Sequence, residues 1–391
     1  MGPIGAFMTS RLEKADIMVN KPGTYAIRVR DPKLYGRVAR SGTVAVGEGY
    51  MERAWECTNL IDTLAHGIEA QFHRRLGGIV NRAAQLAWRL YDEQTLVKAR
   101  RVAEVHYNLG NDLYEVMLGT SMTYTCAYWC AGINSLEAAQ AEKYERICRK
   151  IGLDKRTRGT AVLDIGCGWG GFAAYASERY GAHVVGISLA EEQIRHARER
   201  YADNPNVEFH VMDYRDVPNF YGREAFDAIV SIGMFEHVGP SHYAEYFSVV
   251  DDVLKTGGIA FLHTIGGRGG NDRWINKYIF PGGYIPSEKQ IRRAYEGRFI
   301  RLDLEEFGYF YYLTLKAWLE NFEEAWPKLE RKYGHMQNGQ FYRMWEFYLA
   351  SCAAGFLSGE LKLYQFVLSR CARPDYEPIR ADYPLSLGVS I

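Results

Sequence analysis

Apolar and polar positions alternate in a regular long-range pattern from about residue 160 to residue 265. Short apolar runs predict buried β-strands, and the amphipathic stretches between them predict helices. The expected strands are 160–165, 183–188, 207–212, 226–232 and 258–265, and the expected helices are 170–180, 191–201 and 243–254. This alternation is typical of an α/β protein with a Rossmann-like, doubly wound and mostly parallel sheet.

The pattern changes after residue 265. The stretch 266–299 is rich in glycine, aromatic and basic residues, so we interpret it as a lid insertion that faces the substrate. Beyond it, the sequence predicts a strand at 299–305, a long aromatic helix at 314–326 and a final strand at 361–369. We assign 99–391 to one catalytic domain, which begins with a linker at 99–123.

The N-terminal part has a different pattern. Strands are expected at 25–30 and 42–47, and a helical pattern then runs through 54–57 and 60–64 to near residue 101. We therefore expect a smaller, mixed and mainly helical N-terminal domain at 1–98. A chain of 391 residues is long enough for one large and one smaller domain.

Composition and charge exclude several classes of protein. Hydrophobic residues make up 47% of the chain and charged residues 24%, which fits a globular core. The formal net charge is +0, so a dedicated nucleic-acid binder is not expected. The seven cysteines lack paired metal-ligand spacing, so we expect reduced thiols, no metal site and a cytoplasmic protein. The sequence has no recognisable signal peptide and no apolar run of membrane-spanning length, so any membrane contact would be peripheral.

A glycine-rich loop follows the first expected strand. Residues 162–171 read VLDIGCGWGG, in which Gly166 and Gly168 allow a tight turn and a close approach of the backbone to a ligand. The carboxylate of Asp164 would repel a pyrophosphate but attract the positive methionine part of S-adenosylmethionine. A tight turn without a ligand is the alternative. The strand–turn–helix setting, with Asp213 closing the third strand, favours the cofactor.

The ends of the next two strands supply candidates for the nucleoside part of this cofactor. Asp213 and Tyr214 are placed to hydrogen-bond an adenine amino group and to cover its ring, although a strand-end cap explains Asp213 equally well. The second strand ends in Ser188 and Leu189, where an acidic ribose ligand would be usual. Gln193, one turn into the next helix, could take that role.

Three reactive side chains stand where ligands bind to an open parallel sheet, near the carboxyl ends of its strands. Glu236 follows the fourth strand, His263 lies near the end of the fifth, and Cys126 sits upstream in a linker that could fold over the cofactor. Each has a structural alternative, which is a loop cap, a hydrogen-bonded core histidine and a small buried hydrophobe, respectively. Taken singly, none of them establishes an active site.

Taken together, these segments resemble the cyclopropane-fatty-acyl-phospholipid synthase family, which includes the mycolic acid cyclopropane synthases. The motifs run in order over about two-thirds of the chain: HYNLGND (106–112), YTCAYW (124–129), LDIGCGWGG (163–171), DYRD (213–216), GMFEHVGP (233–240), LHTI (262–265), WINKYIFP (274–281) and GYFYYLTL (308–315). DIMVN (16–20) and GEGYM (47–51) resemble the bacterial members that act on phospholipids. The resemblance implies a class I methyltransferase fold.

The resemblance also implies the ligands of two sites. For S-adenosylmethionine these are Tyr124, Thr125, Gly166, Gly168, Ser188, Leu189, Gln193 and Asp213, beside Asp164 from the loop. For a bicarbonate ion they are Cys126, Glu236, His263, Ile265 through its backbone, and Tyr311. Thr125 replaces the usual serine, and Ala190 follows Leu189 where serine is usual. Both departures keep the backbone contacts available.

The implied reaction transfers a methylene group from S-adenosylmethionine to the cis double bond of an unsaturated phospholipid acyl chain. Methyl transfer leaves a carbocation on the chain, and the aromatic content of 14% offers ring faces that could stabilise it. Bound bicarbonate, oriented by Glu236, His263 and Tyr311, would then remove a proton. The family resemblance also suggests a homodimer.

A basic stretch at 71–101 suggests how the protein reaches its lipid. It holds seven Arg or Lys residues against two acidic ones, with Leu, Ile and Trp interleaved. A basic amphipathic helix can lie on anionic lipid, which would make the N-terminal domain membrane-facing and place the protein at the inner face of the membrane. A solvated helix face packed on the catalytic domain is the alternative.

Three other functions stay open from the sequence. They are a related C-methyltransferase that adds a methyl or methylene branch, a non-catalytic lipid-binding protein with a relic cofactor fold, and a small-molecule methyltransferase. The complete set of Cys126, Glu236, His263 and Tyr311 argues against the relic. The basic N-terminal stretch argues against the small-molecule enzyme.

Overall fold

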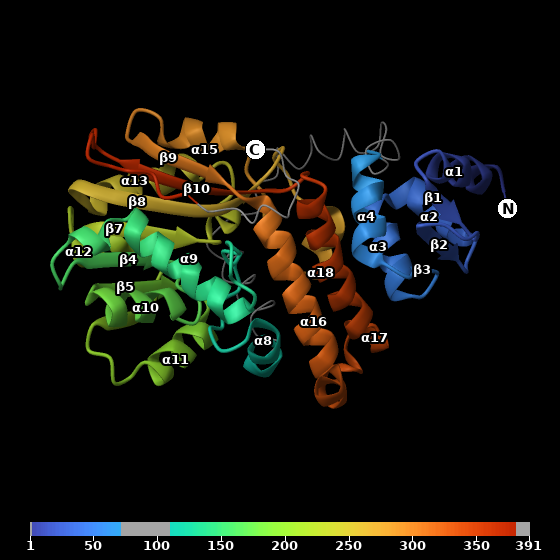
Figure 1. The fold of residues 1–391 in the computed structure, drawn as a ribbon, viewed down its shortest axis with the longest axis horizontal. Coiled ribbons are helices and arrows are strands. Elements are labelled where there is room, and N and C mark those ends of the chain that lie inside the picture. The colour runs from blue at the N-terminus through green and yellow to red at the C-terminus, as the bar shows by residue number, and fades with distance from the viewer. Residues whose placement is uncertain (1, 72–109, 381–391) are drawn as a thin grey trace. The chain divides into compact units, whose positions relative to one another are not determined.

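The computed structural model describes residues 2–71 and 110–380, which fall into two compact units (Figure 1). The first unit comprises Met1–Glu93, Asn271–Pro281 and Tyr311–Leu361, and the second comprises Gln94–Gly270, Gly282–Phe310 and Lys362–Ile391. The expected boundary between 98 and 99 and the start of the linker 99–123 lie outside the described residues, so that division stays a prediction. The stretch 266–299 is divided between the two units, because Asn271–Pro281 belongs to the first unit and the rest of the stretch to the second.

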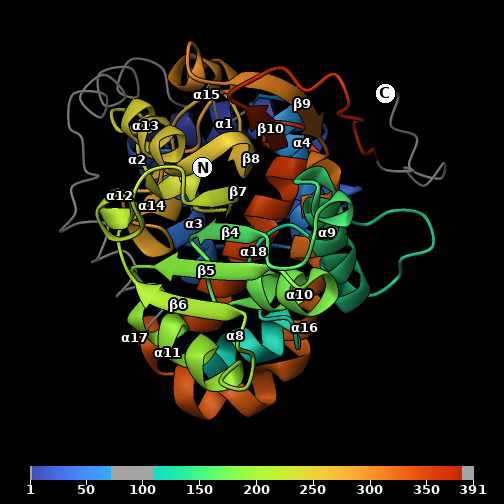
Figure 2. The same cartoon turned by 90° about the vertical axis from the view of Figure 1, so that its left-hand side faces the viewer.

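A seven-stranded sheet forms the centre of the second unit. Its strands lie in the order β6-β5-β4-β7-β8-β10-β9. The neighbours from β6 to β8 are parallel, and β10 runs antiparallel to both β8 and β9 (Figure 2). The strands are β4 (Ala161–Ile165), β5 (His183–Ser188), β6 (Val207–Val211), β7 (Phe226–Ile232), β8 (Leu254–Gly266), β9 (Ile300–Glu306) and β10 (Lys362–Ser369). The predicted α/β, Rossmann-like and mostly parallel fold is confirmed.

Helices cover both faces of this sheet. Alternate residues of β4 face opposite sides, so that Val162 belongs to one apolar cluster and Leu163 to the other. The cluster with Val162 includes α9 (Leu136–Lys150), α10 (Gly171–Tyr180) and α11 (Glu191–Arg200). The cluster with Leu163 includes α12 (Val217–Tyr221), α13 (Tyr243–Val253) and α15 (Glu288–Tyr295). The short helix α8 (Asn111–Leu118) precedes α9.

The first unit is mainly helical and carries a small sheet of three strands. In this sheet, β1 pairs with β2 in parallel and β2 pairs with β3 antiparallel. Most of α16 (Gly308–Tyr333) belongs to this unit, and this helix contains the expected helix 314–326. The other elements are α1 (Pro3–Glu13), β1 (Ile17–Val19), β2 (Tyr25–Val29), α2 (Lys33–Ser41), α3 (Thr43–Met51), β3 (Trp55–Cys57), α4 (Leu60–Glu69), α14 (Arg273–Tyr278), α17 (Met336–Gly339) and α18 (Phe341–Leu357).

Two sequence predictions in this unit are wrong. The expected strand 42–47 is part of α3, a helix in which Gly47 lets Trp274 pack closely, because a Cβ there would lie 2.4 Å from the indole ring. The stretch 54–57, expected to be helical, instead contains β3. This strand pairs with β2, and Trp55 lies opposite Val29. In both places long-range packing overrides a weak local pattern.

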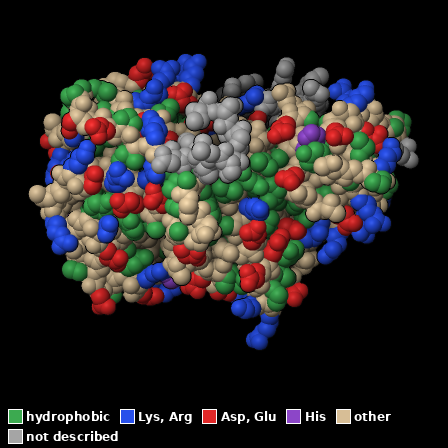
Figure 3. All heavy atoms as spheres, in the orientation of Figure 1, with side chains coloured by type: hydrophobic (Ala, Val, Ile, Leu, Met, Phe, Trp, Pro, Cys, Tyr) green, Lys and Arg blue, Asp and Glu red, His purple; other side chains and the backbone are tan. Residues whose placement is uncertain are grey.

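The charged surface agrees with the balanced composition. On the face drawn in Figure 3, basic and acidic side chains are interspersed, as expected for a chain with 47 Lys or Arg and 47 Asp or Glu residues. Across residues 2–71 and 110–380, no helix combines the length and the apolar character needed to cross a bilayer.

Candidate active site

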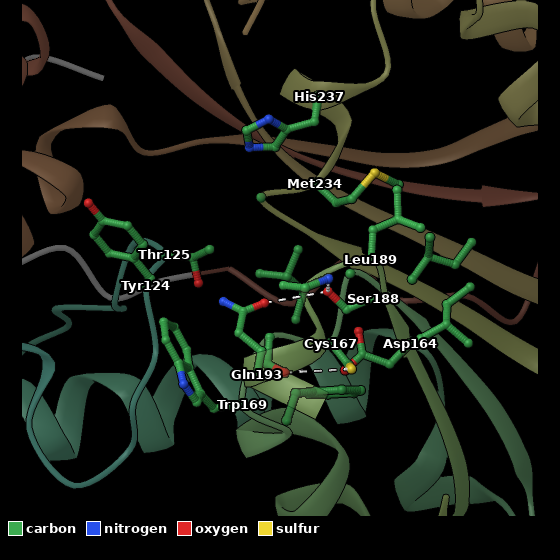
Figure 4. Close-up of a pocket in the computed structure, with 18 of the residues that line it drawn as sticks. Tyr124, Thr125, Asp164, Cys167, Trp169, Ser188, Leu189, Gln193, Met234 and His237 are labelled. Atoms are coloured by element: carbon green, nitrogen blue, oxygen red, sulfur yellow. Dashed lines mark hydrogen bonds between the residues drawn. The ribbon is translucent and has the colours of Figure 1, made fainter. Parts of the chain in front are cut away.

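A pocket opens at the carboxyl ends of β4, β5, β6 and β7, within the second unit. The strand order reverses at β4, which lies between β5 and β7, and this switch point is where open α/β sheets bind ligands. Figure 4 shows side chains from several strand ends and loops that surround the pocket. All nine residues predicted to hold the cofactor line it: Tyr124, Thr125, Asp164, Gly166, Gly168, Ser188, Leu189, Gln193 and Asp213.

The glycine loop turns sharply between β4 and α10. Gly166 has a φ of +85°, and its N–H donates to the carbonyl of Ile187 over 2.8 Å, which ties the loop to the end of β5. A Cβ on Gly166 would lie 2.6 Å from the Cβ of Met234. Gly168 has a φ of +56°, with no atom near the position of a Cβ. The loop therefore needs glycine at position 166 both for its conformation and for space.

Asp164 places a buried carboxylate at the pocket wall. Its side chain is 1% exposed, and Oδ1 has no hydrogen-bond partner among the described residues. Burial raises the pKa of Asp164 to about 7, and the positive charge of Lys143 opposes this shift. A buried carboxylate oxygen without a partner is costly, and a bound cation would remove that cost. The site is thus suited to a positively charged ligand.

The side chains at the next two strand ends are joined by hydrogen bonds. The Ser188 hydroxyl lies 3.4 Å from Gln193 Oε1 and accepts the Ala190 N–H over 3.2 Å (Figure 4). Asp213 accepts two bonds from the Arg215 guanidinium, at 2.7 and 2.8 Å. These contacts fix the orientation of the side chains that are predicted to bind the nucleoside part of the cofactor.

Lys143 is a buried cation beside this pocket that the sequence analysis did not identify. It is fully buried, and its ammonium donates to Thr125 Oγ1 over 2.8 Å. Burial lowers the pKa of Lys143 to about 7, while negative charge on Cys126 and Asp164 would raise it. The sequence did offer a sign that Lys143 is buried, because in the helix α9 it falls on the same face as the buried Ile147.

Glu236 and Ile265 meet in a second cluster. Glu236 Oε1 accepts the Ile265 N–H over 2.6 Å, and Oε2 has no partner among the described residues. Burial raises the pKa of Glu236 to about 7, although hydrogen bonds from Ile265 and Thr264 oppose the shift. Ile265 was predicted to contribute through its backbone, and its N–H is engaged with Glu236 in this structure.

His263 is fully buried on β8. Its Nδ1 lies 3.1 Å from Gln365 Nε2, and its Nε2 has no partner among the described residues. Burial, together with the charges of Lys143 and Lys150, holds its pKa well below the usual value, so the ring is neutral. Two buried polar atoms, one on Glu236 and one on His263, thus lack partners in the described part of the chain.

The other two predicted base-site residues differ in their setting. Cys126 is fully buried, directly follows the pocket residue Thr125, and is close enough to Lys143 to affect its pKa. Tyr311 belongs to the first unit, where its ring stacks on Phe356 at 4.6 Å. Its place in the same site stays a prediction.

Several pocket residues were not among the predicted ligands. Trp169 comes from the glycine loop itself, and its indole N–H donates to Asn111 Oδ1 over 3.1 Å. Met234 and His237 come from the segment that holds Glu236 (Figure 4). Burial lowers the pKa of His237 to about 4, so its ring is neutral. Their positions within two recognised motifs were the signal that could have identified them.

Comparison with known proteins relates the whole arrangement to one family. A family model described as mycolic acid cyclopropane synthetase matches residues 94–366. The cyclopropane-fatty-acyl-phospholipid synthase of Escherichia coli (strain K12) is 41% identical over 366 residues, which cover 92% of this chain and 91% of that protein. The tuberculostearic acid methyltransferase UfaA1 of Mycobacterium tuberculosis is 33% identical over 373 residues, which cover 88% of this chain and 83% of that protein.

Solved structures agree with the sequence match. The crystal structure of mycolic acid cyclopropane synthase CmaA1 complexed with SAH and CTAB is 28% identical, with a TM-score of 0.61. The match covers 69% of this chain and 97% of that structure. The resemblance expected from the motifs is confirmed, and the chain belongs to the mycolic acid cyclopropane synthetase family.

Proposed function

We propose that this protein is a cyclopropane-fatty-acyl-phospholipid synthase, an S-adenosylmethionine-dependent C-methyltransferase that acts on unsaturated phospholipids. One observation carries the proposal. All nine predicted cofactor residues line one pocket at the carboxyl edge of the sheet. They do so in a chain related over nearly its full length to a synthase of that activity.

The pocket fits S-adenosylmethionine. Asp164 offers a buried oxygen without a hydrogen-bond partner among the described residues, which suits the positively charged end of this cofactor. Gly166 and Gly168 would let the backbone approach it, while Gln193 and Asp213 would hold its nucleoside part. When bound, S-adenosylmethionine supplies an electrophilic methyl group, and the role of the protein is to hold that group in line with the acyl double bond.

Glu236 and His263 would together hold a small anion such as bicarbonate, which when bound supplies a base. Glu236 and His263 each keep one buried polar atom without a partner among the described residues, as expected of side chains that hold a ligand. Because the pKa of Glu236 is raised to about 7, this carboxylate can accept a proton near neutral pH. Cys126, Ile265 and Tyr311 complete the proposed set.

Aromatic rings beside His263 suit a cationic intermediate on the acyl chain. The ring of Phe307 lies 6.1 Å from the His263 ring, and Tyr128 packs against Phe307 at 4.9 Å. Ring faces stabilise positive charge without offering a lone pair that would trap it. The burial of these groups would also keep water away from the cation.

We further propose that the protein reaches phospholipid as a peripheral membrane protein at the cytoplasmic face, and that it acts as a homodimer. The basic stretch 71–101 supports the membrane part, although all of it beyond Gln71 lies outside the described residues. Neutralising Arg74, Arg75 and Arg82 together should weaken binding to anionic vesicles, and unchanged binding would contradict this role. Sedimentation equilibrium tests the dimer.

A second candidate is a C-methyltransferase that adds a branch without closing a ring. The relation to a protein named tuberculostearic acid methyltransferase favours it. The same pocket and base cluster would serve, because both reactions remove a proton after methyl transfer.

One assay separates these functions. The protein is incubated with S-adenosylmethionine and vesicles of unsaturated phospholipid, and the released acyl chains are analysed by mass spectrometry. A gain of one methylene with loss of the double bond supports the synthase. A gain of one methylene with a retained double bond supports the branching enzyme, and absence of transfer would contradict both.

A further inference from the structure

Three polar side chains form a row across the antiparallel edge of the large sheet. In the register of β8, β10 and β9, His263 lies opposite Gln365, and Gln365 lies opposite Glu305. His263 and Gln365 are fully buried and Glu305 is 4% exposed. Directly opposed residues on neighbouring strands point to the same face, so their side chains can interact in sequence.

A buried lysine closes this row from helix α9. Lys150 is fully buried, and its Nζ donates to Glu305 Oε2 and, over 2.6 Å, to Gln365 Oε1. Tyr128 donates its hydroxyl to the other Glu305 oxygen over 2.6 Å. Burial lowers the pKa of Lys150, and the charge of Glu305 opposes that shift. Whether charged or neutral, the amine has N–H groups for both acceptors.

These contacts fix the direction of the Gln365 amide. A glutamine amide can be reversed with little change of shape, so its partners decide which end is oxygen. The Gln365 oxygen must face Lys150, since that is where an N–H donor stands. The amide NH₂ therefore faces His263 Nδ1, 3.1 Å away. As an amide nitrogen only donates, Nδ1 of His263 has to accept.

We infer that Lys150 and Gln365 are positioning residues that hold His263 in the tautomer with its proton on Nε2. His263 then faces the site as a hydrogen-bond donor. In the opposite tautomer, an N–H on Nδ1 would point at the N–H of Gln365, and two buried donors would be left without an acceptor. The Nε2 atom is buried and has no partner among the described residues, which leaves its N–H available to an oxygen of a bound ligand.

This inference assigns separate roles within the proposed base cluster, and for that it rests on the proposed function. His263 would donate a hydrogen bond to an anion oxygen, whereas Glu236, with one oxygen held by Ile265 and the other lacking a partner among the described residues, would accept the proton. The tautomer itself follows from the contacts of Gln365 with Lys150 and His263 and does not depend on the proposed function.

The tautomer can be measured directly on the full-length protein. Side-chain nitrogen resonances of uniformly ¹⁵N-labelled protein, recorded by long-range ¹H–¹⁵N correlation, distinguish protonated from unprotonated ring nitrogens. A His263→Gln variant identifies the signal among the ten histidines. We expect an unprotonated Nδ1 and a protonated Nε2 at neutral pH. A protonated Nδ1 with an unprotonated Nε2 in the wild-type protein would overturn the inference.

Gln365→Glu then tests the cause. A carboxylate of the same shape keeps both of its partners but accepts from Nδ1–H, so it should move the proton from Nε2 to Nδ1. We expect kcat to fall about 10²-fold or more, because His263 then no longer offers an N–H on Nε2 to the bound ligand. The Kd for S-adenosylmethionine should stay within about twofold, because Gln365 does not line the cofactor pocket. Gln365→Met should remove the tautomer preference.

Gln290→Glu is a matched control. Gln290 caps α15 in a capping box with Ser287, a position that glutamate also occupies well, so the same amide-to-carboxylate change should leave tautomer and kcat unaltered. An unchanged His263 tautomer in folded Gln365→Glu would contradict the inference. If instead the wild-type tautomer is as expected but no lipid product forms under any condition, the proposed function fails and the tautomer assignment stands.

Discussion

Glu236 accepts the Ile265 backbone N–H over 2.6 Å with one carboxylate oxygen, while its other oxygen is buried and has no partner among the described residues. Because one oxygen orients the group and the other is available, Glu236 can act as a fixed proton acceptor. We expect Glu236→Gln to lose at least about 10²-fold in kcat, within the range typical of general acid–base catalysis. Isothermal calorimetry should show S-adenosylmethionine affinity within about twofold of wild type. Turnover at the wild-type rate would show that Glu236 is not the acceptor.

The raised pKa of Glu236 predicts a pH dependence. Its pKa is about 7 in the folded protein, and only the ionised carboxylate can accept a proton. We therefore expect kcat to rise with pH and to level off above about 7. The pH profile of kcat, measured at saturating substrate and cofactor, checks this. A rate that falls as pH rises from 6 to 8 would have the wrong sign for this role.

Asp164 should show opposite effects on stability and on cofactor binding. A carboxyl group with a raised pKa binds its proton more tightly in the folded protein than in the unfolded chain. The folded protein therefore loses stability as pH rises from the pKa of Asp164 in the unfolded chain to its folded-state pKa of about 7. Asp164→Asn should therefore raise Tm relative to wild type more at pH 8 than at pH 5. The same variant should bind S-adenosylmethionine about 10- to 100-fold more weakly, because a charged hydrogen bond is lost. Equal affinity would contradict the assignment of Asp164 to the cofactor.

Lys143 should disfavour a cationic ligand in the neighbouring pocket. Its ammonium bonds to Thr125, which lines that pocket, and it is charged below a pKa of about 7. At pH 6, Lys143→Met should raise the affinity for S-adenosylmethionine relative to that for the uncharged S-adenosylhomocysteine by about 3- to 10-fold. The exposed residue Lys289 provides the control substitution, Lys289→Met. A ratio that does not differ between the two variants would contradict the prediction.

Gly166 should be intolerant of a side chain for two separable reasons. In Gly166→Ala the new Cβ would sit at a residue with positive φ and would also clash with Met234. In Gly222→Ala the residue has a φ of +80°, but no atom lies within 4 Å of the new Cβ. Both variants should lose about 1 to 3 kcal/mol of stability from backbone strain. Only Gly166→Ala should also weaken S-adenosylmethionine binding, because the loop or Met234 must move. Thermal unfolding and calorimetry on the two proteins measure the difference, and equal binding in both would contradict a role for the loop in holding the cofactor.

The regular part of the fold could be predicted because its pattern is strong. Every expected strand between 160 and 265 overlaps an observed strand, since period and burial agree there. The helix α3 was missed because a stretch of small and β-branched residues has no clear period, and packing of Gly47 against Trp274 decides its conformation. The division of the chain into units could not be foreseen, because Asn271–Pro281 joins the N-terminal segment through long-range contacts.

The pocket residues of the proposed cofactor site could be predicted from motifs, whereas the residues that support them could not. Most predicted ligands stand at a strand end or in the glycine loop, where sequence order determines position. Tyr124 and Thr125 precede the first strand of the large sheet, and Gln193 lies in α11, so the motifs were needed to predict these three. Lys143 and Lys150 lie on the buried face of α9, seven residues apart. Only the sheet register shows that Lys150 and Gln365 meet beside His263. Such relations depend on strand pairing across large sequence separations, which no local pattern records.

The central claim is that this protein closes a cyclopropane ring on a phospholipid acyl chain. The most direct measurement supplies S-adenosylmethionine whose methyl group carries deuterium in place of all its hydrogens, together with cis-unsaturated phospholipid vesicles. Mass spectrometry and hydrogenation of the acyl chains then report the product. We predict that the added carbon keeps all but one of its deuterium atoms and that the product resists mild hydrogenation, since a proton is removed and no double bond is left. A product that keeps a double bond, or every deuterium of the methyl group, would contradict the claim.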